Sequence, residues 1–186
     1  MRADFSVTPR WRSSVQVESG SRSSATCGRS APRILAVTLH GHDVTGAHES
    51  LAAVDVDQVW PVADVTILAA PATAATRHLI GAAELSKMKP NDWIVNIARG
   101  SLVDTDAHAT CLARSGIGGA ALDVTDPEPL PDGHPLWSEP RALITPHVAN
   151  PEDAALASFC GLVEDNIRRL VAGDDLVGSI DVDAGY

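Results

Sequence analysis

Three side chains that can hold a carboxylate and move a proton each follow a short apolar run in this 186-residue chain. They are Arg99, Glu128 and His147, which come after the runs at 93–97, 119–122 and 142–144. In an open parallel sheet, ligands bind beyond the carboxyl ends of the strands, so residues that follow different strands converge on one crevice. A guanidinium pairs with a carboxylate through two parallel hydrogen bonds, and an imidazole can act as a general acid and base. The combination suits the oxidation of a 2-hydroxy acid or the reduction of a 2-oxo acid.

Each of the three residues also has a simpler interpretation. Arg99 could be a surface residue near a helix start, but a cation there gains nothing from the helix dipole, so a ligand explains it better. His147 could be a satisfied structural histidine, whereas a carboxylate beside it would stabilise its imidazolium form. Glu128 could be a solvated loop residue, but Pro127 and Pro129 stiffen the backbone on both sides of it.

The elements that must position these residues alternate along the chain from Ile34, which predicts a parallel α/β sheet with right-handed crossovers. We expect five parallel strands at Ile34–Leu39, Val65–Ala69, Trp93–Ile97, Gly118–Leu122 and Ala142–Ile144. We expect helices on both faces, at Val54–Trp60, Gly81–Met88 and Asp104–Arg114, and a C-terminal helix capped by Asn150 with Pro151 in its first position. The segments His40–Ser50 and Asp126–Pro140 are predicted to be loops.

Residues 1–33 differ in composition from the rest of the chain. They are rich in Ser and Arg, and only Val15–Val17 alternates like a strand. Such a segment cannot bury enough apolar area to offset its chain entropy, so we expect it to be atypical and disordered. The predicted organisation is therefore 1–33 as this segment, 34–150 as a partial dinucleotide-binding domain, and 151–186 as a C-terminal helix and tail.

Composition narrows the class of protein. The chain is 45% hydrophobic and 20% charged, and its formal charge is −10. Six Arg against Asp4 and Glu18 give residues 1–33 a charge of +4, so the remainder carries −14, which disfavours nucleic acid as a partner. The apolar runs are too short to cross a bilayer, and no secretion signal is apparent. Three cysteines without a CxxC pair point to a reducing, cytoplasmic location.

Three segments resemble the motifs of the D-isomer-specific 2-hydroxyacid dehydrogenase family: NIARGSLVD (96–104), GAALDVTDPEP (119–129) and TPHVA (145–149). The resemblance runs from residue 63 to 149, continues loosely to 186, and fails before residue 31. It implies an incomplete Rossmann-like, doubly wound parallel sheet with a C-terminal helix. It also implies hydride transfer between NAD or NADP and a small 2-oxo or 2-hydroxy acid, and a possible homodimer through the cofactor domain.

The resemblance assigns roles to individual residues. Arg99 would bind the substrate carboxylate and polarise the carbonyl, His147 would give or remove the proton, and Glu128 would orient His147. The cofactor would contact Thr38, Pro71, Ala98, Arg99, Asp123, His147 and Asn150. Pro71 would line the adenine side. Asp123 would contact the nicotinamide end, although a role as a helix or turn cap is an equal alternative.

One expected element is missing. A complete member of the family should have a strand and a GxGxxG turn before Ile34, and should have the first half of its substrate domain there as well. The nearest candidate, Val15–Val17 followed by Gly20–Ala25, places Arg22 where the second glycine should be, and its side chain would occupy the space of a phosphate. The segment Gly116–Ala121 imitates the fingerprint but precedes its strand, so we reject it. The sequence therefore predicts a truncated dehydrogenase.

Several alternatives stay open. The first predicted strand is followed by neither an acidic residue for an NAD ribose nor an Arg for an NADP phosphate, so the cofactor is NAD or NADP. One rival function is a catalytically inactive fragment or a non-enzymatic binding module of the same fold. Another is a formate dehydrogenase, which carries Gln where Glu128 stands. His40, His42 and His48 lie in a loop without other spaced ligands, so we expect no metal.

Overall fold

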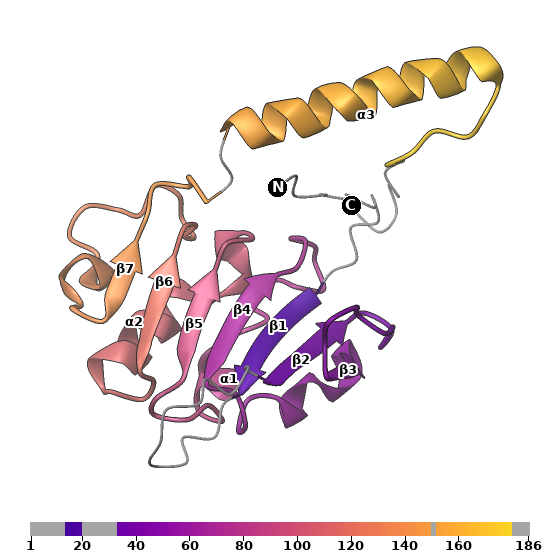
Figure 1. The fold of residues 1–186 in the computed structure, drawn as a ribbon. Coiled ribbons are helices and arrows are strands. Elements are labelled where there is room, and N and C mark those ends of the chain that lie inside the picture. Colours follow the sequence, from indigo (N-terminus) through magenta and orange to yellow (C-terminus); the bar gives the residue numbers. More distant parts are fainter. Residues whose placement is uncertain (1–13, 20–32, 150–151, 180–186) are drawn as a thin grey trace, which may run out of the picture. The chain divides into compact units, whose positions relative to one another are not determined.

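The computed structural model describes residues 14–19, 33–149 and 152–179 (Figure 1). The chain divides into a sheet unit that ends at Ala149 and a second unit that contains the C-terminal helix, and each is described by itself. The sheet has seven strands in the order β3-β2-β1-β4-β5-β6-β7. Their bounds are β1 Ser14–Ser19, β2 Arg33–Thr38, β3 Glu49–Ala52, β4 Val65–Ala69, β5 Trp93–Asn96, β6 Gly119–Leu122 and β7 Ala142–Ile144. The predicted α/β sheet of Rossmann type is confirmed.

The central strand β1 runs against its neighbours. It pairs antiparallel with both β2 and β4, between which it lies in Figure 1, whereas β2 and β3, and the series β4 to β7, pair in parallel. Ser14 at its amino end is opposite Thr38 and Ala69, which are the last residues of β2 and β4. Ser19 at its carboxyl end is opposite Arg33, the first residue of β2. The carboxyl end of β1 therefore lies at the rim where the other strands begin.

Short helices connect the strands of the sheet unit. The α-helices are α1 (Ala82–Leu85) and α2 (Thr105–Ala113), and the 3-10 helices are η1 (Ala53–Gln58), η2 (Gly100–Leu102) and η3 (Pro135–Ser138). The Asp104 carboxylate accepts a hydrogen bond from the Ala107 N–H at 3.0 Å and so caps α2. This cap sets the start of the helix directly after the loop that carries Arg99.

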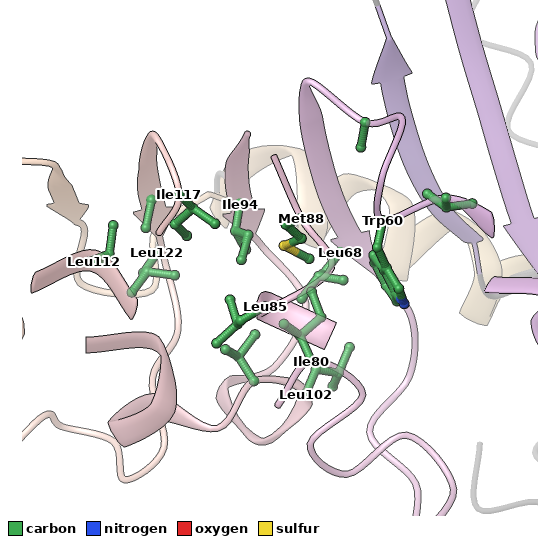
Figure 2. Packing of buried hydrophobic residues seen from close by; sticks show 14 of the residues in the cluster. Trp60, Leu68, Ile80, Leu85, Met88, Ile94, Leu102, Leu112, Ile117 and Leu122 are labelled. Carbon is green, nitrogen blue, oxygen red and sulfur yellow. The ribbon is translucent and has the colours of Figure 1, made fainter. Parts of the chain in front are cut away.

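The core lies between the sheet and the connecting segments. Alternate residues of β4 and β5 point into it, so Leu68 and Ile94 are fully buried. Figure 2 shows Ile80, Leu85 and Leu102 gathered around them from the connections that follow β4 and β5. The opposite face of the same strands is less covered: Trp93 in β5 is 42% exposed.

Three predicted boundaries need correction. Part of the segment 1–33 forms β1, so that segment is not irregular throughout; its remaining residues before Arg33 lie outside the described ranges. The predicted loop His40–Ser50 ends in a strand, β3, which has half-buried side chains and only one large aliphatic residue, Leu51. The predicted helix Val54–Trp60 is the 3-10 helix η1, which buries none of its residues.

The second unit contains α3 (Glu152–Ala172), which is followed by Gly173 with a positive φ of 79°. The Asn166 side chain holds the tail against this helix: its amide donates to the Val177 carbonyl and its oxygen accepts from the Val177 N–H, both at 2.9 Å. The expected cap Asn150 and Pro151 lie outside the described residues. Within those residues, no helix is long and apolar enough to cross a bilayer.

Candidate functional site

The carboxyl ends of β5, β6 and β7 lie side by side. Asn96 is in register with Leu122, and Leu122 with Ile144. The three segments that follow these residues carry Arg99, then Asp123 and Glu128, then His147. The edge formed by these three strand ends and the segments 97–100, 123–128 and 145–149 is the candidate catalytic edge of the sheet, and we call it the catalytic rim. The placement follows from parallel pairing, which brings residues far apart in sequence to one edge of the sheet.

Glu128 and His147 meet at the catalytic rim. The Nδ1 atom of His147 is 2.7 Å from Oε1 of Glu128, and the two side chains are 48% and 43% exposed. The predicted contact between them is therefore confirmed. His147 has a φ of 56°, a left-handed conformation that a non-glycine residue adopts at a cost. At these exposed fractions, both side chains of the pair are accessible to solvent.

The turn that carries His147 is held by a buried carboxylate. Asp123, 6% exposed, accepts hydrogen bonds from the Thr145 hydroxyl and from the N–H groups of Val148 and Ala149, at 2.6, 2.9 and 2.9 Å. Burial raises the pKa of Asp123, but these three hydrogen bonds and the nearby His147 outweigh it and hold the pKa below its usual range. Asp123 is therefore ionised at neutral pH inside the fold.

Arg99 projects from a loop that is braced by a second buried polar side chain. Asn96, 1% exposed, donates to the Arg99 carbonyl at 2.9 Å and accepts from the Ala98 N–H at 3.1 Å. The exposed Arg99 guanidinium donates to the Ala98 carbonyl at 2.6 Å. Its remaining N–H groups are free to face a ligand, because a guanidinium has five donors.

Gly100 brings the arginine loop against the glutamate loop. A Cβ atom at this position would lie 1.9 Å from the Thr125 carbonyl oxygen, which no side chain permits. The backbone at residue 100 can therefore touch the peptide at 125, three residues before Glu128. This contact sets how closely the segments of Arg99 and Glu128 approach.

The other predicted cofactor contacts are distributed along the sheet. Thr38, the last residue of β2, is buried, and its hydroxyl accepts from the His42 N–H at 2.9 Å. Pro71 follows β4, and its carbonyl accepts from the Thr76 hydroxyl at 2.7 Å. Both therefore lie at the carboxyl ends of strands that end at the same rim as β5 to β7. Asn150 lies outside the described residues, so the structure places it neither at the site nor away from it.

Sequence reasoning missed three residues that shape this rim: Asn96, Gly100 and Thr145. Each belongs to a quoted motif, but nothing in the residue types revealed a role. A polar residue at the end of an otherwise apolar strand, as Asn96 is, was the one available signal, because a buried amide needs partners.

The histidine loop after β2 shows no arrangement for a metal. The rings of His40 and His42 lie edge to face with centroids 5.6 Å apart. The Nδ1 atom of His48 accepts from the Ile34 N–H at 3.1 Å. Across the parts of the chain that the structure describes, no group of three or more His, Cys, Asp or Glu side chains could hold a metal ion.

The chain is similar in sequence to known proteins from other organisms. It is 44% identical over 154 residues to an uncharacterized protein from the proB 3′ region of Corynebacterium melassecola, covering 83% of this chain and 51% of that protein. It is 36% identical over 120 residues to a glyoxylate reductase of Thermofilum pendens, covering 64% of this chain and 35% of that enzyme. The chain thus spans about half, or less, of the length of these curated relatives.

A solved structure and a family model agree with these relatives. The structure is an NADPH-dependent glyoxylate/hydroxypyruvate reductase from Sinorhizobium meliloti in complex with NADP and sulfate. It superposes with a TM-score of 0.74 at 29% identity, covering 82% of this chain and 49% of that one. The family model for the NAD binding domain matches residues 20–149. The match begins at residue 20, so the expectation that the resemblance fails before residue 31 is wrong. The chain belongs to the D-isomer specific 2-hydroxyacid dehydrogenase family and contains its NAD-binding domain.

Proposed function

We propose that the catalytic rim is the substrate-binding and proton-transfer site of a 2-hydroxyacid dehydrogenase that acts on a small 2-oxo acid. The observation that carries this proposal is the 2.7 Å contact between His147 Nδ1 and Glu128 Oε1, at the same strand ends that present Arg99. The names of the relatives, a glyoxylate reductase and a glyoxylate/hydroxypyruvate reductase, support a small 2-oxo acid as the substrate class.

Each residue has a distinct role in this proposal. The Arg99 guanidinium binds the substrate carboxylate and draws the adjacent carbonyl toward the rim. Glu128 accepts from Nδ1 of His147, so Nε2 is the nitrogen that exchanges a proton with the substrate oxygen. Glu128 also stabilises the imidazolium that donates the proton during reduction.

The cofactor of the family fits this chain only in part. A bound NADH or NADPH would supply the hydride. A dinucleotide needs backbone N–H groups at a helix start, just beyond the carboxyl end of the central strand, to hold its pyrophosphate. The carboxyl end of β1 lies at the opposite rim, where β2 begins, so the described residues do not fit the pyrophosphate. We therefore assign this chain the substrate and proton steps alone.

A second candidate function is a catalytically inactive fragment or binding module of the same fold. The direction of β1 favours it, because the rim can still hold a carboxylate while the cofactor lacks its main anchor. Under this alternative the purified chain binds a 2-oxo acid without reducing it.

The test measures binding and turnover separately. Glyoxylate is titrated into the purified chain while the His147 and Arg99 side-chain signals are followed by NMR, and NADH or NADPH oxidation is measured in parallel. We expect millimolar binding and very weak turnover. Arg99→Ala should weaken glyoxylate binding about tenfold or more, because a charge-assisted bidentate contact is lost.

The matched control is Arg114→Ala. Arg114 is an exposed arginine at the end of α2, just before β6 begins, so it belongs to the opposite rim. Its removal changes the net charge by the same amount and should leave binding unchanged. An equal loss of glyoxylate binding in both variants would show that Arg99→Ala acts only through the net charge, and would contradict the assignment of Arg99 as the carboxylate-binding residue. Robust turnover of the wild-type chain would instead contradict the limit set by β1.

A further inference from the structure

We propose that Asp123 is a positioning residue that holds His147 in place through the turn 145–149. The inference deepens the proposed function, since it rests on the role of His147 at the catalytic rim. It differs from the cofactor contact expected of Asp123, because it needs no ligand.

The hydrogen bonds of Asp123 bracket His147 on both sides. Its Oδ1 accepts from the Thr145 hydroxyl at 2.6 Å and from the Val148 N–H at 2.9 Å, and its Oδ2 accepts from the Ala149 N–H at 2.9 Å. One carboxylate thus fixes the residue two positions before His147 and the two residues after it. Both oxygens are engaged inside the chain, which supports a role in the turn before any role toward a nicotinamide.

Asp123 is itself anchored to the sheet. Its N–H donates to the Asn96 carbonyl at 3.0 Å, and the Thr145 N–H donates to the Leu122 carbonyl at 2.9 Å. Asp123 as a whole is 6% exposed, and these backbone hydrogen bonds tie it to β5 and β6. The turn at 145–149 is therefore attached, through Asp123, to β5 and β6, and β5 also leads into the Arg99 loop.

The turn needs this support because of the backbone of His147. Its φ of 56° is a conformation that a non-glycine residue keeps only when its surroundings over-determine it. Glu128, the partner of the imidazole, belongs to a different loop and is 43% exposed, so it cannot impose that conformation by itself. Without Asp123, we expect residue 147 to relax to a negative φ and its ring to leave Glu128.

A merely structural cap would stabilise the turn without affecting the imidazole, so the readout must be the imidazole itself. The measurement is the tautomer of His147, followed by long-range proton–nitrogen NMR. In the wild type, the contact with Glu128 favours the proton on Nδ1. Asp123→Asn turns one of the two carboxylate oxygens into an N–H donor, which then faces either the Val148 or the Ala149 N–H group. The change should lower the ratio of the Nδ1–H to the Nε2–H form about tenfold.

Two further variants keep the test decisive. Thr145→Val removes one of the three hydrogen bonds and should shift the tautomer ratio in the same direction by a smaller factor. Asp132→Asn removes an exposed carboxylate from the loop after Glu128 and should leave the ratio unchanged. If Asp123→Asn does not fold, the Thr145 variant decides alone. An unchanged ratio in the folded variants overturns the proposal.

The outcome is independent of the proposed reaction. If glyoxylate fails to bind the wild-type chain while Asp123→Asn still displaces the tautomer, the proposed function fails and the positioning role stands. If glyoxylate binds and the tautomer does not respond, the reverse holds.

Discussion

Asp123 and Asp92 are both buried aspartates beside strand ends, but they lie at opposite rims of the sheet. Asp123 follows β6 and has three hydrogen bonds that hold its pKa below the usual range. Asp92 precedes β5 and is fully buried; its Oδ2 accepts from the Thr66 hydroxyl at 3.3 Å, and its Oδ1 has no hydrogen-bond partner. Burial, its largest influence, raises the pKa of Asp92 to about 6.

The difference between the two pKa values comes from the hydrogen-bond donors that surround a buried carboxylate at each rim. At the catalytic rim the chain turns sharply at 145–149 and points two backbone N–H groups at the Asp123 carboxylate. At the other rim the Thr66 hydroxyl, the Trp93 backbone and the charge of Lys89 lower the pKa of Asp92, but together they are too weak to offset desolvation. Asp123 thus stays ionised at the catalytic rim, whereas Asp92 is protonated more readily at the opposite rim, where β1 also has its carboxyl end.

The largest effect on stability should come from Gly100→Ala at the catalytic rim. A Cβ there would lie 1.9 Å from the Thr125 carbonyl oxygen, so the glutamate loop must move away. We expect a loss of about 3 kcal/mol in the free energy of unfolding, measured by urea denaturation. The control is Gly161→Ala in α3, where nothing lies within 4 Å of the new Cβ; it should stabilise its helix by about 1 kcal/mol. Equal effects at both glycines would show that the two loops do not touch at residue 100.

Asp92→Asn tests the opposite rim through its pH dependence. The pKa of Asp92 is raised to about 6 from 3.8, so between these values the folded protein holds a proton that the unfolded chain has lost. Its contribution to stability is therefore present below pH 3.8 and is lost as the pH rises through 6. We expect the variant to be more stable than the wild type at pH 7 by up to about 3 kcal/mol, and equal to it near pH 3.

The comparison with wild type is essential because His108 also makes the stability depend on pH in this range, with the opposite sign. Burial lowers the pKa of His108 from 6.5 to about 4, so it contributes stability above pH 6.5 that is lost as the pH falls toward 4. The difference between variant and wild type cancels this contribution. A difference that stays constant from pH 3 to pH 7 would show that Asp92 does not titrate in the fold.

The smallest effect should come from Glu128→Gln. The Glu128–His147 pair is about half exposed on both sides, and exposed ion pairs contribute about 0–1 kcal/mol. We expect the urea midpoint to change little, while the tautomer preference of His147 is lost. A large fall in stability would mean that the pair holds the rim together, and that its place at the site reflects folding instead of chemistry.

The sequence predicted much of the sheet because local patterns carry that information. Val65–Ala69 and Ala142–Ile144 are strands with the bounds that apolar runs between turn residues indicated. The strand β3 was not predicted, because its side chains are half-buried at most and it contains only one large aliphatic residue, Leu51. The contact between Glu128 and His147 was predictable since both follow strands of one parallel sheet.

By itself, the sequence determined the fold class, the positions of the strands from β4 to β7, and the residues that follow their carboxyl ends, because these depend on periodicity and on one topological rule. Only the tertiary structure decided the direction of β1, since alternation at Val15–Val17 indicates a strand equally well for either pairing direction. The same holds for Asp92 and Asp123. Residue type is identical at the two positions, and their opposite pKa shifts come from partners 26 residues away for Asp92, and 22 to 26 residues away for Asp123, which only folding brings into contact.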